Sequence, residues 1–141
     1  MKKKAGFTLI ELLVVITMIG LIASIVVPKL FHKIKGAKQN TAQAQIEALC
    51  MGLDAYYLDI GTYPSEEDGF AVLLQPKPGQ DDWDGPYLNK EPPNDPWGNP
   101  YIYKCPGENK RPYEIISYGR DGKPGGEDED TDVLSYKNLT K

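Results

Sequence analysis

An acidic segment close to the C-terminus carries the residue types that bind hard metal ions. Residues 127–132 include five acidic side chains among six positions, and glycines and a proline fill much of the stretch just before them. Calcium binds roughly six to eight oxygen atoms, from carboxylates and backbone carbonyls, on a flexible loop. Glycines allow such a loop to fold back on itself, which would bring Asp121 close to Asp128. We therefore expect a calcium-binding loop over residues 117–132.

An alternative to this calcium loop is a solvated acidic segment with no bound ion. The alternating aspartates from Asp128 begin like an EF-hand, but Val133 occupies the position at which that loop requires glycine. The turn glycines nevertheless favour calcium. An ion that neutralises adjacent carboxylates would stabilise the loop and the strands beside it.

A second set of residues with potential chemistry lies at the start of an apolar segment. Residues 7–27 contain a single charged side chain, Glu11, and three lysines precede them. A helix of this length spans roughly 30 Å, the thickness of the hydrocarbon core of a bilayer. The lysines place the N-terminus in the cytoplasm. A carboxylate within such a helix is costly, so we expect Glu11 to have a function and a cationic partner.

Three interpretations of this segment follow from the residues alone. A secretory signal peptide has a basic start and an apolar core, and a simple membrane anchor has the right length, but neither accounts for Glu11. The third interpretation, which we favour, is cleavage after Gly6, which gives Phe7 a free amine four residues from Glu11. That amine, or the amine of a neighbouring copy, would pair with the carboxylate. Pairing between copies would fix the axial register of assembled helices.

The composition excludes several classes of function. The 141 residues carry a net charge of −4 with a pI of about 5.0, which disfavours a nucleic-acid binder because such proteins need a basic surface for phosphates. One histidine and two cysteines offer little for a zinc site or for a nucleophile–base pair. We therefore expect a protein that is not an enzyme and that binds no nucleic acid.

One long helix is expected to position the N-terminal residues. Its first part, residues 7–28, would span the membrane and form the core of an assembly, and residues 29–61 would continue it as an amphipathic half. Apolar residues recur at spacings of three and four between Ile46 and Ile60, which predicts one buried face. Pro28 should bend this helix of roughly 50 residues, and a glycine and a proline end it after residue 60.

Residues 62–141 are expected to form a loop-rich head with a small antiparallel sheet. Segments rich in tyrosine and isoleucine at 101–103 and 113–118 predict strands, and 133–136 is a weaker candidate. Ser65 is a candidate N-cap for a short helix near residues 67–74. The fold class is therefore α+β, with the sheet packed on the second half of the long helix.

The two cysteines allow two arrangements. The head would lie outside the cytoplasmic membrane, where disulfides persist, so Cys50 on the helix and Cys105 after the first strand could be bridged. Two buried free thiols are equally compatible with the sequence, because sequence position does not give the distance between the two Cα atoms.

The N-terminal residues resemble a known processing signal. The sequence KAGFTLIE at 4–11, after a short basic start and before an apolar helix, is similar to the type IV prepilin signature. In that family a prepilin peptidase cuts after the glycine that Gly6 matches and methylates the new amine, here that of Phe7. The resemblance therefore implies a cleaved leader over residues 1–6. It also implies that Glu11 pairs with the terminal amine of an adjacent subunit during filament assembly.

The head resembles one branch of this superfamily, the major pseudopilins of type II secretion systems. The matching segments are YYLDIGTYP at 56–64, GPYL at 85–88 and DPWGNPY at 95–101, so the similarity covers nearly the whole chain. It implies a subunit of a homo-oligomeric helical filament in the periplasm that drives protein export. The implied partners are the prepilin peptidase, minor pseudopilins and an assembly platform in the bacterial inner membrane, which the chain crosses once before assembly. A type IV pilin for adhesion or motility is the alternative, and a membrane-anchored calcium-dependent hydrolase is a remote one.

The same resemblance implies a set of calcium ligands. The side chains of Asp121 and Asp128 match the carboxylate ligands of the family, while Asp130 and Asp132 are substitutes or supporting groups. The matching backbone carbonyls are those of Tyr118, Lys123 and Glu129.

Overall fold

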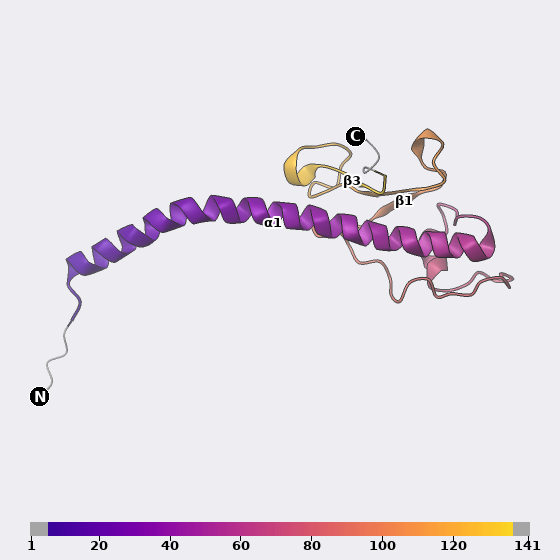
Figure 1. Cartoon of the computed structure of the whole chain (residues 1–141), viewed down its shortest axis with the longest axis horizontal. Coiled ribbons are helices and arrows are strands. Elements are labelled where there is room, and N and C mark those ends of the chain that lie inside the picture. The colour runs from indigo at the N-terminus through magenta and orange to yellow at the C-terminus, as the bar shows by residue number, and fades with distance from the viewer. Residues whose placement is uncertain (1–5, 137–141) are drawn as a thin grey trace, which may run out of the picture. The chain divides into compact units, whose positions relative to one another are not determined.

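The computed structural model describes residues 6–136, apart from the side chains of residues 31 and 32. Residues 1–5 of the predicted leader lie outside the described residues. The chain divides into two compact units, Met1–Gly36 and Ala37–Lys141. The elements, in chain order (Figure 1), are α1 (Leu9–Ile60), η1 (Ala71–Leu73), β1 (Ile102–Lys104), η2 (Glu108–Lys110), β2 (Glu114–Ser117), η3 (Asp128–Asp130) and β3 (Val133–Leu134).

The long helix predicted from the sequence is confirmed. α1 has 52 residues and continues through Pro28, so the predicted bend does not end it. It ends at Ile60, and the next residue, Gly61, has a positive φ of 82° that reverses the chain. The N–H of Gly61 donates to the carbonyl of Tyr57 at 2.8 Å. This is a common way to end a helix, because glycine adopts the left-handed conformation without steric cost.

The first unit consists mainly of the apolar part of α1. An 18-residue window of this helix has a mean hydropathy of 2.7, and none of that window is buried against other described residues. Among residues 6–136, this is the one helix long and apolar enough to cross a membrane. The exposed apolar side chains fit an environment of lipid or of other apolar helices.

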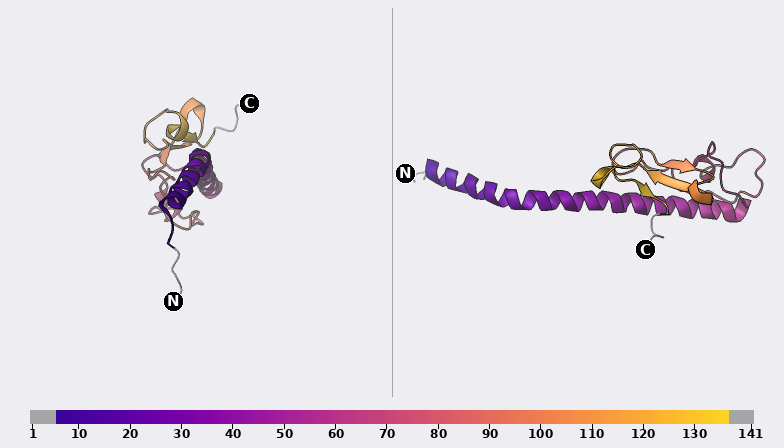
Figure 2. Two further views of the ribbon diagram at one scale, coloured as in Figure 1. Left: turned by 90° about the vertical axis from the view of Figure 1, so that its left-hand side faces the viewer. Right: turned by 90° about the horizontal axis from the view of Figure 1, so that it is seen from above.

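The second unit is built on the amphipathic half of α1, which confirms the predicted buried face. Ile46 and Leu53 are fully buried, together with Leu73 of η1 and Ile115 of β2. Ile60 is only half-buried, because it is the last residue of the helix. Figure 2 shows the sheet lying along this half of α1. The α+β fold is therefore as expected.

The three strands form one antiparallel sheet in the order β1-β2-β3. Tyr103 pairs with Ile115 between β1 and β2, and Ser117 pairs with Val133 between β2 and β3. All three strands fall within or next to the predicted segments and are only two to four residues long. Long connections therefore make up most of the head.

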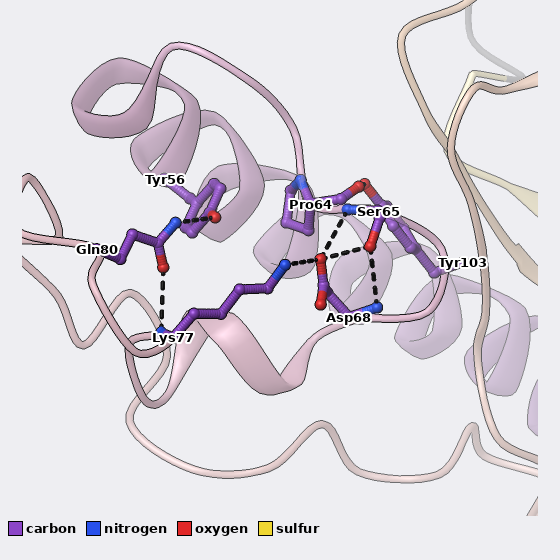
Figure 3. Close-up of polar contacts among 7 residues, drawn as sticks. All are labelled: Tyr56, Pro64, Ser65, Asp68, Lys77, Gln80 and Tyr103. Carbon is purple, nitrogen blue, oxygen red and sulfur yellow. Dashed lines mark hydrogen bonds and ion pairs between the residues drawn. The ribbon is translucent and has the colours of Figure 1, made fainter.

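The helix predicted near residues 67–74 is wrong in extent. The structure has turns followed by the three-residue η1, because Gly69 adopts a positive φ of 52° that interrupts a helix. Ser65 does cap the first turn, since its hydroxyl accepts a hydrogen bond from the N–H of Asp68 at 3.3 Å. The ammonium of Lys77 pairs with the Asp68 carboxylate and closes this connection (Figure 3).

Candidate functional site

The start of α1 is an N-terminal cap built by two side chains. Thr8 precedes the helix, and its N–H and hydroxyl both donate to Oε2 of Glu11, at 2.9 and 2.8 Å. The N–H of Glu11 donates in turn to the Thr8 hydroxyl at 3.3 Å. This reciprocal arrangement is a capping box. Glu11 therefore has a partner within its own chain. The Thr-x-x-Glu spacing in the sequence was the signal for this contact, which was not predicted.

The predicted cleavage bond lies just outside this helix. Gly6 and Phe7 are exposed and have no helical or strand structure, and the Phe7 side chain is 90% exposed. A peptidase requires an accessible bond in a segment that can extend, and both conditions hold here. Phe7 and Glu11 thus lie on either side of the point where the helix begins, with the Thr8 cap between them.

The acidic segment folds back on itself through glycines, as expected. Gly119 has a φ of 63°, and a Cβ added there would lie 2.6 Å from the carbonyl oxygen of Glu129. Gly126 has a φ of 95°, and a Cβ there would lie 2.4 Å from the carbonyl oxygen of Asp130. Any larger residue at these two positions would push the two sides of the loop apart.

Within this loop several of the predicted ligands make hydrogen bonds that involve backbone groups. Oδ1 of Asp121 accepts from the N–H of Lys123 at 3.1 Å, and the carbonyl of Glu129 accepts from the N–H of Arg120 at 2.9 Å. Asp132 accepts from the N–H of Gly125 through Oδ2 at 2.9 Å. Within residues 6–136, no three side chains of His, Cys, Asp or Glu converge into a metal-binding group. A site here would therefore depend on backbone carbonyls as well as carboxylates.

The loop contains a cationic side chain, that of Arg120, whose contacts with the acidic residues were not predicted from the sequence. The guanidinium of Arg120 contacts both oxygens of Asp130, at 3.0 and 3.1 Å, and Oε2 of Glu129 at 3.3 Å. The hydrogen bonds to Asp130, together with its charge, raise the pKa of Arg120 above its usual value. Asp130 is thus engaged by arginine, which argues against this carboxylate as a calcium ligand. The signal for these contacts in the sequence was one arginine close to a run of acidic residues.

A buried carboxylate anchors the entrance to the loop. Asp95 is 4% exposed and accepts hydrogen bonds from the hydroxyl of Ser117 at 2.6 Å and from the N–H groups of Trp97 and Asn99 at 3.0 and 2.8 Å. The side chain of Asn99 donates to the carbonyl of Gly119 at 2.6 Å. The turn at 95–99 therefore holds the end of β2 and the first glycine of the loop together.

The two cysteines are free thiols in the structure, and both are half-buried rather than buried. Sγ of Cys105 lies 3.3 Å from the carbonyl oxygen of Pro112, to which it donates a hydrogen bond. Cys50 is half-buried on α1, and burial raises the pKa of its thiol. A thiol with a raised pKa is poorly reactive, so Cys50 is not a candidate nucleophile.

Comparison with known proteins connects these features. A family model described as "Type II secretion system (T2SS), protein G" matches residues 29–136. The chain belongs to this type II secretion protein G family. A second model, described as a prokaryotic N-terminal methylation motif, matches residues 1–27, so the N-terminal segment and the protein G head each have their own match.

Individual relatives agree with this family along almost the whole chain. Type II secretion system core protein G of Pseudomonas aeruginosa is 39% identical over 97% of this chain and 98% of its own length. The protein of the same name from Vibrio cholerae is also 39% identical, over 96% and 94%. The crystal structure of the major pseudopilin of enterohaemorrhagic Escherichia coli matches with a TM-score of 0.59 and 34% identity, over 76% of this chain and 93% of that one. The chain is therefore a pseudopilin by sequence and by fold.

Proposed function

We propose that this pseudopilin is a structural, non-enzymatic subunit that polymerises into the periplasmic pseudopilus of a type II secretion system. One observation carries the proposal: the apolar half of α1 is exposed along its length, while Glu11 lies at its first turn. In the inner membrane, lipid would cover these side chains, with the head in the periplasm. After assembly, the helices of other copies would cover them. Minor pseudopilins and an inner-membrane assembly platform are the partners expected for such a filament.

Processing would prepare the N-terminus for this assembly. A prepilin peptidase would hydrolyse the bond between Gly6 and Phe7 and methylate the amine of Phe7. The accessible, non-helical backbone at both residues supports this step. Glu11 would then exchange its contact with Thr8 for the terminal amine of an adjacent copy, because an ion pair shielded from water is stronger than one in solvent.

We further propose that the loop over residues 117–132 binds calcium through the side chains of Asp121 and Asp128 and the carbonyls of Tyr118, Lys123 and Glu129. The donor chemistry supports this, since all of these ligands are oxygen atoms. The close backbone approach at Gly119 and Gly126 supplies a loop with a defined conformation. Bound calcium would neutralise acidic side chains of the loop and would order the head for assembly.

The test of the assembly proposal separates the two contacts of Glu11. Glu11→Gln keeps an oxygen for the Thr8 cap and removes the charge, whereas Thr8→Ala removes the hydroxyl of the cap and keeps the charge. We expect Glu11→Gln to be processed and inserted but to form no filaments, and Thr8→Ala to form them. Filaments from Glu11→Gln would contradict the proposal. Mass spectrometry of the mature protein should also find N-methylated Phe7 as the first residue.

A further inference from the structure

The second half of α1 carries a second apolar stripe on the side away from the head. The first stripe, which includes Ile46 and Leu53, is buried. The second lies on nearly the opposite side of the helix by helical periodicity. Its two largest residues, Met51 and Leu58, are 71% and 81% exposed. We call this stripe the outer seam; its residues are Ala37, Thr41, Ala44, Ala48, Met51, Ala55 and Leu58.

The spacing of the outer seam is that of a helix-packing surface. Its members alternate at steps of four and three, which is the 3.5-residue repeat of helices packed side by side. Its alanines allow two backbones to approach closely. The one hydroxyl, that of Thr41, donates to the carbonyl of Ala37 at 2.9 Å and so needs no outside partner. Large exposed apolar side chains in such a row mark an interaction surface rather than a solvated face.

Charges flank the outer seam and are segregated along the helix. Lys33 and Lys38 precede the seam or lie at its start, whereas Glu47 flanks its middle and Asp54 and Asp59 flank its end. Lys33 and Asp54 lie on one flank of the seam, and Lys38 and Asp59 lie on the other. In a parallel helix pair, a residue on the first flank faces the residue five positions later on the second flank of the partner. Two copies in register would therefore place Lys33 against Lys38 and Asp54 against Asp59. Both contacts are repulsive, so the charges disfavour this register.

A shift of one copy along the other converts both repulsions into attractions. Asp54 follows Lys33 by 21 positions, and Asp59 follows Lys38 by the same number. This number is three full repeats of the seam, so the apolar positions stay aligned after the shift. Lys33 of one copy then faces Asp59 of the other, and Lys38 faces Asp54. At 1.5 Å per residue the shift is about 31 Å.

We propose that the outer seam binds the α1 helix of a second copy of this chain that is parallel and displaced outward by three seam repeats. This inference rests on the proposed function, which makes the copies parallel because all enter the membrane in the same direction. Met51, Ala55 and Leu58 of one copy cover Leu30, Ile34 and Ala37 of the copy ahead. Leu30 and Ile34 are 56% and 46% exposed within one chain. The outer seam thus covers Leu30 and Ile34 of the copy ahead, which lipid covered before that copy left the membrane.

Cysteine cross-linking measures this displacement directly. Ile34→Cys combined with Ala55→Cys places thiols at positions that meet only after a shift of three repeats. Ala55→Cys alone reports the in-register pair, and Ile34→Cys with Ala48→Cys reports a shift of two repeats. The unmodified chain, with its two half-buried native cysteines, is the blank. Filaments are released from the periplasm, oxidised and separated on non-reducing gels.

We expect a ladder of multimers for Ile34→Cys with Ala55→Cys, and no ladder for the two control variants. A ladder in either control, or filaments of the double variant without a ladder, would overturn the inference while leaving the proposed function intact. Absence of filaments from the unmodified chain would instead remove the proposed function, and the inference with it.

Charge variants test the flanks independently and decide the question if the cysteine variants do not assemble. Lys33→Glu with Lys38→Glu should abolish filaments. Lys29→Glu with Lys35→Glu has the same net charge in the same segment, but its positions lie away from the flanks, so it should retain them. The aspartates are left unchanged because Asp54 and Asp59 accept hydrogen bonds from tyrosines of the head. Equal loss in both lysine variants, or filaments from both, would overturn the inference.

Discussion

Gln39 of α1 donates a hydrogen bond through Nε2 to the main-chain oxygen of Asp128 at 2.7 Å. The two residues are far apart in sequence, and this contact ties the acidic loop to the helix at the start of the second unit. The side chain of Gln39 therefore links the order of the loop to the position of this part of the helix. Calcium binding in the loop would act on the helix through the same contact.

Gln39→Ala should destabilise the second unit by about 1 kcal/mol, the usual net value of one hydrogen bond. The melting temperature of the full chain in detergent should fall by roughly 3–5 °C. Gln43→Ala is the matched control, because it makes the same substitution on the same helix and removes only a contact of 3.4 Å to Glu47. Equal effects of both substitutions would show that the loop contact contributes nothing specific.

Calcium should raise the melting temperature of the full chain by about 10 °C when its concentration is about 100 times the Kd. Asp121→Asn and Asp128→Asn should remove this increase, because each loses a charged ligand. Asparagine also tolerates the positive φ of 55° at Asp128. Asp130→Asn should keep the increase, since Arg120 engages that carboxylate. Loss of the calcium effect in Asp130→Asn alone would assign the ion a different position.

The sequence predicted the elements whose patterns are local and repeated. The stripe from Ile46 to Tyr56 has helical spacing, so its burial followed from periodicity alone. The prediction of a helix near 67–74 was wrong because Gly69 adopts a left-handed conformation, which a pattern of apolar residues does not indicate. The contacts of Arg120 were missed because the sequence shows which charges are near but not which of them pair.

Asp95→Ala should destabilise the head by about 3 kcal/mol or more, because it leaves a buried hydroxyl and two N–H groups without their acceptor. Calcium affinity should fall as well, since the same turn holds Gly119 through Asn99. Urea denaturation of the full chain in detergent measures the first effect. Asp82→Ala removes an exposed carboxylate and should change stability by no more than about 0.5 kcal/mol. A similar loss in both variants would rule out an anchoring role for Asp95.

Two tyrosines of the head should make its stability sensitive to alkaline pH. Tyr63 and Tyr87 donate to Asp54 and Asp59 of α1, at 3.1 and 2.7 Å. Burial, together with these carboxylates, raises the pKa of each tyrosine to about 12. A pKa that is higher in the folded state favours the protonated form there, so the stabilisation is complete below about pH 10 and is lost as the pH rises to about 12.

Ultraviolet absorbance of tyrosinate, recorded on the folded full chain, should therefore show late titration of these two side chains. Tyr87→Phe should remove one late-titrating group and weaken the loss of stability between about pH 10 and pH 12, because phenylalanine has no proton to release. It also removes the hydrogen bond to Asp59, so the variant should be less stable than the unmodified chain at neutral pH. The two stability curves should then converge as the pH rises, whereas parallel curves would show that Tyr87 is not linked to folding through its proton.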